Sequence, residues 1–210
     1  MRLLITAGPT REHLDDVRYL SNASSGRMGL AVAAAGARRG HAVTVVLGPV
    51  ELAPPPGVEV VRVVSAEEMR EAVARLFPAC DAAVMAAAVA DYAPAERIPG
   101  KRKKGAEDWV VRLRRTRDIL AEAGREKGAR VLVGFALEAG RPEEGARAKL
   151  REKRLDLVVL NGPENLGTER GTVALIPAAG EPERLRDLEK GEIAERIVGW
   201  IERELERRRS

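Results

Sequence analysis

A long segment between the first apolar run and the first helix offers groups that suit an anion. The run Leu3–Ala7 is followed by about twenty residues before the next helix, whereas connections in α/β proteins usually have two to six. Within this segment, NASSGRMG (residues 22–29) offers free backbone N–H groups, two hydroxyls and the guanidinium of Arg27, which suit a phosphate or a carboxylate. The alternative is that Ser24 and Ser25 cap the helix. Because long ordered loops are usually functional, the segment is a candidate binding site.

Two later apolar runs end in residues that can meet a ligand. AAAVADY (residues 86–92) has three alanines that leave room for a flat group, and Asp91 can meet a cation or a polar ligand edge. The alternative is tight packing of the alanines, with Asp91 capping a turn. VGFALE (residues 133–138) places Phe135 and Glu138 at the same rim, where Phe135 either stacks on a base or belongs to the core.

Positive charge is concentrated in one segment. Between Arg97 and Arg117 there are nine basic and two acidic residues, so this segment carries +7, whereas the whole chain carries only +4. A local positive field indicates a local anionic partner, and KRKK (residues 101–104) is its densest part. Lys149 and Lys153 are four residues apart and share one helix face, although the ordinary interpretation of that helix is a solvated charged surface.

The elements that must position these residues alternate between short apolar runs and helical patterns. Strands are predicted at Leu3–Ala7, Ala42–Leu47, Val58–Val64, Ala82–Ala88, Val131–Ala136 and Leu155–Leu160, and helices at Gly29–Arg39, Ala66–Phe77, Thr116–Glu126, Pro142–Lys153 and Glu192–Arg208. This order predicts one α/β domain over residues 1–210, with a Rossmann-like, mainly parallel sheet and helices on both faces. Residues 92–115 break the alternation and predict a protruding basic hairpin arm, in which WVVRLRR (residues 109–115) suggests an edge strand.

Several classes of protein are disfavoured by composition. A single cysteine, Cys80, and two histidines, His13 and His41, do not make a cysteine-rich or multi-histidine metal centre. No G-x-G-x-x-G follows the first strand and no acidic residue follows the second, which disfavours NAD. No apolar run reaches the length of a signal peptide core or a membrane span, so a cytoplasmic location without membrane contact is expected. The 29 arginines and the absence of glutamine fit a thermophilic source or a GC-rich genome.

Six strings, in this order, closely resemble the bacterial form of phosphopantothenate–cysteine ligase: ITAGPTRE, VRYLSNASSGRMG, AAAVADY, the KRKK arm, VGFALE and AKLREKRLDLVVLN. The resemblance covers residues 1 to about 176. It implies a Rossmann-like fold and a homodimer in which the arm of one protomer helps to close the site of the other. It also implies a reaction of coenzyme A biosynthesis, in which CTP activates 4′-phosphopantothenate as an acyl-cytidylate and releases pyrophosphate. The amine of cysteine then attacks and releases CMP, with Mg²⁺ required and no flavin in this chain.

The resemblance also assigns residues. It associates Asn22 with the acyl-cytidylate step, Lys101 with formation of that intermediate, and Arg18, Asn22 and Ala88 with 4′-phosphopantothenate. The nucleotide-binding positions that it implies are Ser24, Gly26, Asp91, Lys101, Asp118, Ile119, Phe135, Lys149 and Lys153. Asp91 is also the expected metal contact, through the nucleotide phosphates.

The chain departs from the family pattern in two places. Thr116-Arg117-Asp118-Ile119 stands where the family has Asn followed by Pro-Asp-Ile, so Arg117 is either an additional phosphate contact or a sign that backbone contacts differ there. NLGTERGTV (residues 165–173) replaces a Phe-Gly-Ser-Asp pattern. In many bacteria this ligase is fused behind phosphopantothenoylcysteine decarboxylase. Because the first strand begins at Arg2, we expect either a separate ligase or an excised ligase domain.

Two other functions stay open at this stage. An ATP-dependent ligase of the same family is one, because a base contact made by the backbone leaves no trace in the sequence. A nucleic-acid-binding module that uses the arm is the other, although the arm has only Trp109 as an interleaved aromatic residue, so no nucleic acid partner is expected.

Overall fold

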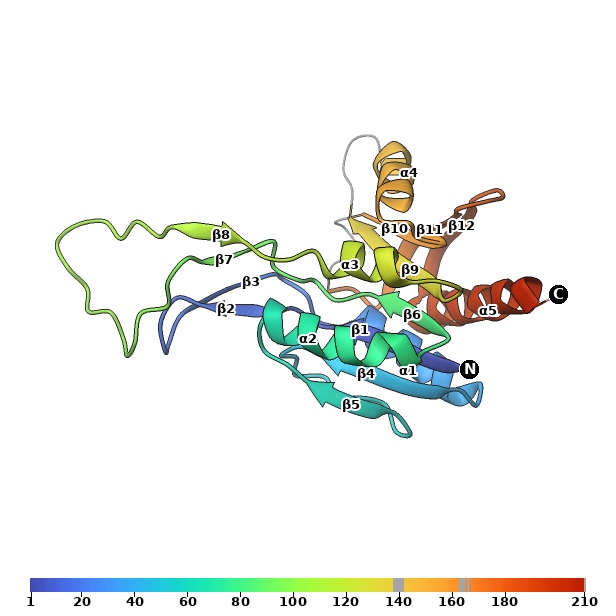
Figure 1. Ribbon diagram of the computed structural model, residues 1–210, viewed down its shortest axis with the longest axis horizontal. Helices are drawn as coiled ribbons and strands as arrows, with labels where there is room; N and C mark the ends of the chain where they lie inside the picture. The colour runs from blue at the N-terminus through green and yellow to red at the C-terminus, as the bar shows by residue number, and fades with distance from the viewer. Residues whose placement is uncertain (138–141, 163–164, 166, 210) are drawn as a thin grey trace.

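A computed structural model describes residues 1–137, 142–162, 165 and 167–209, and an eight-stranded sheet is its centre (Figure 1). The sheet order is β12-β11-β10-β9-β6-β1-β4-β5. The strands are β1 (Arg2–Ala7), β4 (Ala42–Leu47), β5 (Glu59–Arg62), β6 (Ala82–Met85), β9 (Val131–Leu137), β10 (Leu157–Asn161), β11 (Arg170–Pro177) and β12 (Glu183–Glu189). The pairs from β5 through β10 are parallel and the pairs made by β11 are antiparallel, which confirms the predicted mainly parallel α/β fold.

Helices cover both faces of this sheet. Contacts in the two apolar cores place α1 (Arg27–Arg38) and α5 (Lys190–Arg209) on one face, and α2 (Ala66–Leu76), α3 (Ile119–Glu126) and α4 (Pro142–Glu152) on the other. A short 3₁₀ turn (Phe77–Ala79) follows α2. One transverse row shows the packing: Val45, Ile5, Val84, Val133 and Leu157 are partners across five strands, and all are fully buried beneath α1 and α5. No helix in the described part of the chain combines the length and apolar character needed to cross a bilayer.

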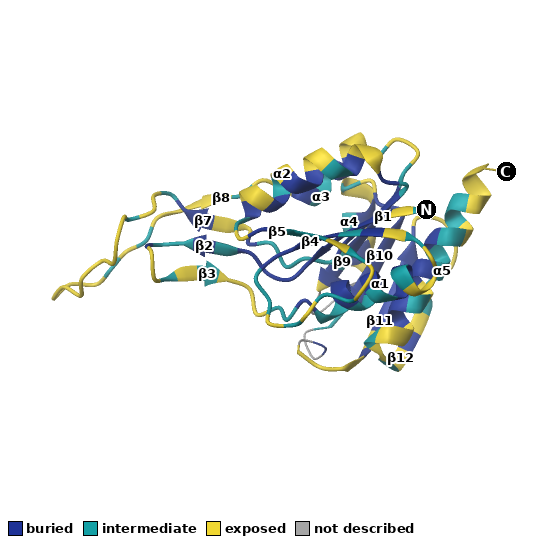
Figure 2. Ribbon diagram, turned by 90° about the horizontal axis from the view of Figure 1, so that it is seen from below, coloured by how far each residue is buried: buried dark blue, intermediate teal, exposed yellow. Residues whose placement is uncertain are grey.

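Two short hairpins extend beyond one end of the sheet (Figures 1 and 2). The first-loop hairpin pairs β2 (Arg11–His13) with β3 (Tyr19–Ser21), and the arm (residues 92–115) pairs β7 (Tyr92–Pro94) with β8 (Leu113–Arg115). The two hairpins are joined by backbone hydrogen bonds, from Asp16 N to Gly100 O and from Ile98 N to Leu14 O. The arm is therefore attached at residues 98–100 to the loop that follows β1.

The structure corrects several sequence predictions. Strands β11 and β12 were not predicted, because β12 is a charged edge strand, ERLRDLE, with only Leu185 fully in the core. WVVRLRR is not an edge strand of the main sheet: only Leu113–Arg115 is extended, and it pairs with β7. The strand predicted over Ala82–Ala88 ends at Met85, since the following backbone leaves the sheet to bond with the first loop.

The structure also begins two helices at residues other than those predicted, because of local capping interactions. Helix α1 begins at Arg27 rather than Gly29, because Gly26 already stands at its N-cap. Helix α3 begins at Ile119 rather than Thr116, because Asp118 caps it and Thr116 N donates to Asp91 O. Helices α2, α4 and α5 lie within about two residues of their predicted bounds.

Candidate active site

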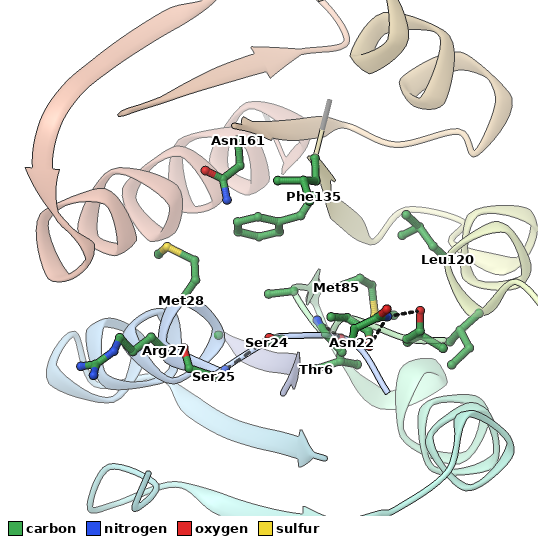
Figure 3. Close-up of a pocket in the computed structure, with 18 of the residues that line it drawn as sticks. Thr6, Asn22, Ser24, Ser25, Arg27, Met28, Met85, Leu120, Phe135 and Asn161 are labelled. Carbon is green, nitrogen blue, oxygen red and sulfur yellow. Dashed lines mark hydrogen bonds between the residues drawn. The ribbon is translucent and has the colours of Figure 1, made fainter. Parts of the chain in front are cut away.

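The main pocket lies at the carboxyl ends of the parallel strands, where open α/β sheets bind their ligands (Figure 3). Its volume is about 620 Å³. It is enclosed by residues 22–29, by the segment after β6, and by the N-terminal ends of α3 and α5, with side chains from α4 and β9. Ten of the twelve residues that the resemblance assigned to the site line it: Asn22, Ser24, Gly26, Ala88, Asp91, Asp118, Ile119, Phe135, Lys149 and Lys153.

The start of α1 is uncapped by any side chain. Gly26 occupies the N-cap in a left-handed conformation (φ 75°), which glycine adopts without steric cost, and no side chain accepts from the first-turn N–H groups. Ser24 Oγ instead accepts from Gly26 N at 3.3 Å, so the alternative that Ser24 or Ser25 caps the helix is wrong. Gly29 brings α1 against the sheet, because an added Cβ would lie 2.5 Å from Ala7 Cβ. The helix therefore presents its first N–H groups towards the pocket.

Asn22 ties the first loop to the segment after β6. Its Nδ2 donates to the carbonyl oxygens of Ala88, at 3.0 Å, and Val89, at 3.1 Å. Figure 3 shows these bonds at the floor of the pocket. The same segment is held by Ala88 N, which donates to Gly8 O at 2.9 Å. The Asn22 side chain is thus fixed on a floor made of backbone.

Asp91 is one of two exposed carboxylates that line the pocket, the other being Asp118. Its backbone oxygen accepts from Thr116 N at 3.0 Å, so the position is fixed by the main chain. Among the described residues its carboxylate makes no hydrogen bond or ion pair, and the alternative that this side chain caps a turn is therefore not supported. A carboxylate placed in this way is available to a cation or to a ligand.

Lys149 of α4 and Lys153, the residue directly after α4, reach the pocket beside Phe135. Lys149 Nζ donates to Phe135 O at 2.6 Å, and Lys153 Nζ pairs with Asp118 Oδ2 at 2.8 Å. Asp118 also caps α3 by accepting from Ala121 N at 2.9 Å. Burial raises the pKa of Asp118, but the hydrogen bonds from Lys153 and Ala121 outweigh it, so the pKa lies below its ordinary value and the carboxyl stays ionised. Phe135 is half-buried with its ring at the pocket, rather than enclosed in the core.

The described lining is electropositive. Five cationic residues line the pocket, Arg27, Arg117, Lys149, Lys153 and Lys190, against two carboxylates. Such a surface favours polyanions. Sequence reasoning missed Lys190, Asn161 and Asn165. Asn161 ends β10 one residue beyond the predicted strand, and Asn165 and Lys190 flank the two strands that were not predicted. Glu138, which was predicted at this rim, lies outside the described residues.

Arg18 and Lys101 are not in this pocket. Lys101 is exposed on the arm. Arg18 lies in the first-loop hairpin, where its guanidinium pairs with Asp15, donates to Arg102 O at 2.9 Å, and lies 4.4 Å from the centroid of the Trp109 ring. Within one chain, therefore, the two residues belong to the arm and its attachment.

The described residues contain no group of three or more histidine, cysteine, aspartate or glutamate side chains that would enclose a metal ion. Asp91, whose carboxylate has no partner among the described residues, lies in a cationic pocket and fits Mg²⁺, which keeps several waters and binds through one or two carboxylates and substrate phosphates.

Comparisons with known proteins agree with this architecture. Residues 1–205 match the family described as "DNA/pantothenate metabolism flavoprotein C-terminal domain". The chain is 43% identical over 206 residues to "Cysteine/Cysteine sulfinic acid decarboxylase" from an unknown prokaryotic organism, covering 95% of this chain and 57% of that protein. It is 39% identical over 204 residues to "Coenzyme A biosynthesis bifunctional protein CoaBC" from Bacillus subtilis (strain 168), covering 95% of this chain and 50% of that protein.

A solved structure of a related protein has the same fold. The crystal structure of the C-terminal domain of coenzyme A biosynthesis bifunctional protein CoaBC superposes with a TM-score of 0.85 at 40% identity, covering 98% of this chain and 95% of that one. The chain spans about half the length of the curated relatives named above. Since the family match extends over almost the whole chain, this protein belongs to the family of the DNA/pantothenate metabolism flavoprotein C-terminal domain.

Proposed function

We propose that this chain is a CTP-dependent phosphopantothenate–cysteine ligase of coenzyme A biosynthesis. The observation that carries the proposal is that one cationic pocket unites the uncapped start of α1, Asn22 on the backbone of Ala88 and Val89, and the lysines of α4. Two findings support it: the family membership, and the name of the Bacillus subtilis relative, a bifunctional protein of coenzyme A biosynthesis.

The first half-reaction turns a poor electrophile into a good one. A carboxylate oxygen of 4′-phosphopantothenate attacks the α-phosphorus of CTP, the bond to the β-phosphate breaks, and pyrophosphate leaves with its electron pair. Negative charge grows on the phosphoryl oxygens, and the positive lining of the pocket stabilises it. Lys149 and Lys153 supply charge from α4, and Phe135 offers a ring face for the cytosine.

In the second half-reaction the cysteine amine attacks the acyl carbon, CMP leaves, and the amine loses a proton. Both N–H groups of the Asn22 side chain are engaged by Ala88 and Val89. The atom that Asn22 offers to a ligand is therefore Oδ1, which can accept from the attacking amine and orient it.

Mg²⁺ would be held by Asp91 and the nucleotide phosphates, and it would supply charge neutralisation for phosphoryl transfer. The chain's own contribution is the placement of Asp91 by the Thr116–Asp91 backbone bond.

In this proposal the arm supplies Lys101, and the first-loop hairpin bonded to it supplies Arg18. Since neither residue lines the pocket of its own chain, we propose a homodimer in which the arm of one protomer completes the pocket of the other. The exposed apolar side chains of the two hairpins, among them Val17, Tyr92 and Val110, are consistent with such a contact. A phosphopantothenoylcysteine decarboxylase, fused or separate, is the proposed partner enzyme, in line with the bifunctional relative.

Mass spectrometry tests the proposal. The purified protein is incubated with 4′-phosphopantothenate, Mg²⁺ and either CTP or ATP, with and without cysteine. We expect a cytidylate adduct without cysteine, and phosphopantothenoylcysteine plus CMP once cysteine is added. Product from ATP alone would keep the ligase and overturn the choice of nucleotide. No product from either nucleotide, together with steep salt-dependent binding to DNA, would favour the nucleic-acid-binding alternative.

A further inference from the structure

Two positively charged residues that lie far apart in the sequence line the same part of the pocket. Arg27 is the first residue of α1 and Lys190 is the first residue of α5. Both line the 620 Å³ pocket, and both also line an adjoining cavity of about 490 Å³. They therefore stand where the two cavities meet.

Neither cation is well compensated within the described part of the chain. Lys190 is half-buried and takes part in no described ion pair; its Nζ donates to Asn165 O at 3.3 Å. Burial, and then the charge of Arg27, lower its pKa. Arg27 pairs at 3.4 Å with the highly exposed Glu169, and its Nε is buried without a hydrogen-bond partner.

Two other partly buried lysines of this protein each have a carboxylate partner. Lys127 pairs with Asp156 at 2.6 Å, and Lys153 pairs with Asp118 at 2.8 Å. Lys190 lies near Arg27 and has no carboxylate partner among the described residues, which costs free energy because like charges repel and burial disfavours the charge of the ammonium group. An anionic ligand between them would remove both costs.

We propose that Arg27 and Lys190 form a polyphosphate subsite, which takes the terminal phosphoryl groups of the nucleotide triphosphate and then the pyrophosphate that it releases. This assignment rests on the proposed function. A chain of linked phosphates fits better than a single phosphate, because the two cations border both cavities and the adjoining one gives room beyond the pocket. The charged lining of that cavity also includes Arg170, which pairs with Glu189, and Glu169, which pairs with Arg27. Asn165 is the positioning residue: its side chain is bonded to Asn161 Oδ1 and Thr172 O, and its backbone oxygen holds Lys190.

Calorimetric titration of CTP, CMP and inorganic tripolyphosphate tests the subsite. We expect Lys190→Gln and Arg27→Gln each to weaken CTP and tripolyphosphate about tenfold or more, and CMP less than about twofold, since a charge-assisted hydrogen bond is lost only to the terminal phosphates. Lys190→Arg should keep most of the affinity. The matched control is Arg186→Gln, which removes an exposed charge of β12 outside both cavities.

A thermal melt separates binding from a structural role. Lys190→Met should leave the melting temperature of the ligand-free protein unchanged or raised, because it removes a buried like-charge contact. Three results would overturn the subsite. The Lys190 and Arg27 variants could lose affinity for CTP and CMP equally, they could bind CTP with unchanged affinity, or Lys190→Met could lower the melting temperature while binding stays intact. A larger loss of affinity for 4′-phosphopantothenate than for CTP would also overturn it, in favour of the substrate phosphate.

The two proposals fail in different ways. If the unaltered protein binds tripolyphosphate through Lys190 but does not use CTP, the subsite stands and the ligase function falls. If the ligase reaction proceeds and the Lys190 variants bind CTP normally, the subsite alone falls.

Discussion

The side-chain nitrogen of Asn22 lies 3.0 Å from the carbonyl oxygen of Ala88, and this bond joins the loop after β1 to the segment after β6. The two strands are neighbours in the sheet, so the bond closes the floor of the pocket at their carboxyl ends. Because a second bond to Val89 uses the other N–H, only Oδ1 is left for a ligand. The Oδ1 atom of Asn22 is therefore suited to accept a hydrogen bond from a donor such as an amine.

From this geometry, Asn22→Ala should separate the two half-reactions. We expect pyrophosphate release to stay within about threefold of normal and amide formation to fall about a hundredfold, because orientation of the amine is lost. Single-turnover measurement of pyrophosphate and of phosphopantothenoylcysteine checks both. The control is Ser21→Ala, which removes a bond from the same loop to Thr10 O without touching the pocket. Equal losses in both half-reactions would remove the assigned role.

Lys101→Ala should act on the other half-reaction. Lys101 is exposed and its replacement leaves no cavity, so the melting temperature should change by less than about 2 °C. Pyrophosphate release should fall about a hundredfold, because a cation that stabilises the phosphoryl-transfer transition state is removed. Lys104→Ala, three residues along the same exposed segment, is the matched control. A normal burst of pyrophosphate from the Lys101 variant would refute this role.

Mixing the Asn22→Ala and Lys101→Ala proteins tests whether the pocket is shared. If the arm of one protomer serves the pocket of its partner, a mixed dimer contains one pocket with both residues intact, and activity should recover to about a quarter of normal after random exchange. Subunit exchange is verified with two affinity tags. Proven exchange without recovery would show that one chain completes its own site.

Much of this architecture followed from sequence patterns, and the exceptions have local causes. The buried parallel strands were predictable, since a strand covered on both faces is a short continuous apolar run, as AVTVVL of β4 shows. The edge strand β12 was not predictable, because five of its seven residues are charged and hide the alternation of its two leucines. Pocket residues near the first loop were predictable from the motif, whereas Lys190 was not, since nothing local marks a lysine that faces Arg27 across the fold.

The attachment of the arm could not be predicted from the sequence either. Asp15 is fully buried and accepts from Val17 N at 2.9 Å, Arg18 N at 2.8 Å, Arg102 N at 3.2 Å and the Arg18 guanidinium. An aspartate in a charged loop ordinarily signals solvent exposure. Only the long-range contact with Arg102 shows that this carboxylate anchors the arm.

Replacing that anchor should loosen the arm. The Arg18 side chain and backbone N–H groups hold the pKa of the Asp15 carboxyl well below its ordinary value. The ionised carboxylate therefore stabilises the fold at any pH above the pKa of Asp15 in the unfolded chain, and this contribution is lost only as the pH falls through the lowered value. Asp15→Asn should therefore free the arm at neutral pH. The guanidinium groups of Arg18 and Arg102 lie 4.4 and 4.8 Å from the Trp109 ring centroid, so Trp109 fluorescence, read in a Trp200→Phe background, should change.

The comparison for that experiment is Asp16→Asn, which breaks an exposed pair with Arg97 and keeps an amide oxygen that can accept from Gly100 N, as the carboxylate does. It should change Trp109 fluorescence and trypsin cleavage at residues 101–104 less than Asp15→Asn does, because exposed pairs contribute little. Indistinguishable effects of the two variants would show that Asp15 is not the anchor.

A pair of glycine substitutions tests the contact that positions α1. An added Cβ at Gly29 would lie 2.5 Å from Ala7 Cβ and 3.1 Å from Thr6 O, so Gly29→Ala must move α1 away from β1. We expect it to lower the free energy of unfolding by about 1–3 kcal/mol, as overpacking does, and to reduce CTP binding, because the first turn of α1 lines the pocket. Gly191→Ala is the matched control near the start of α5, where an added Cβ meets nothing within 4 Å; it should leave stability unchanged or raise it by up to about 1 kcal/mol. Urea denaturation measures both variants. A Gly29→Ala protein as stable as Gly191→Ala would mean that α1 is not held in place by its contact with Ala7.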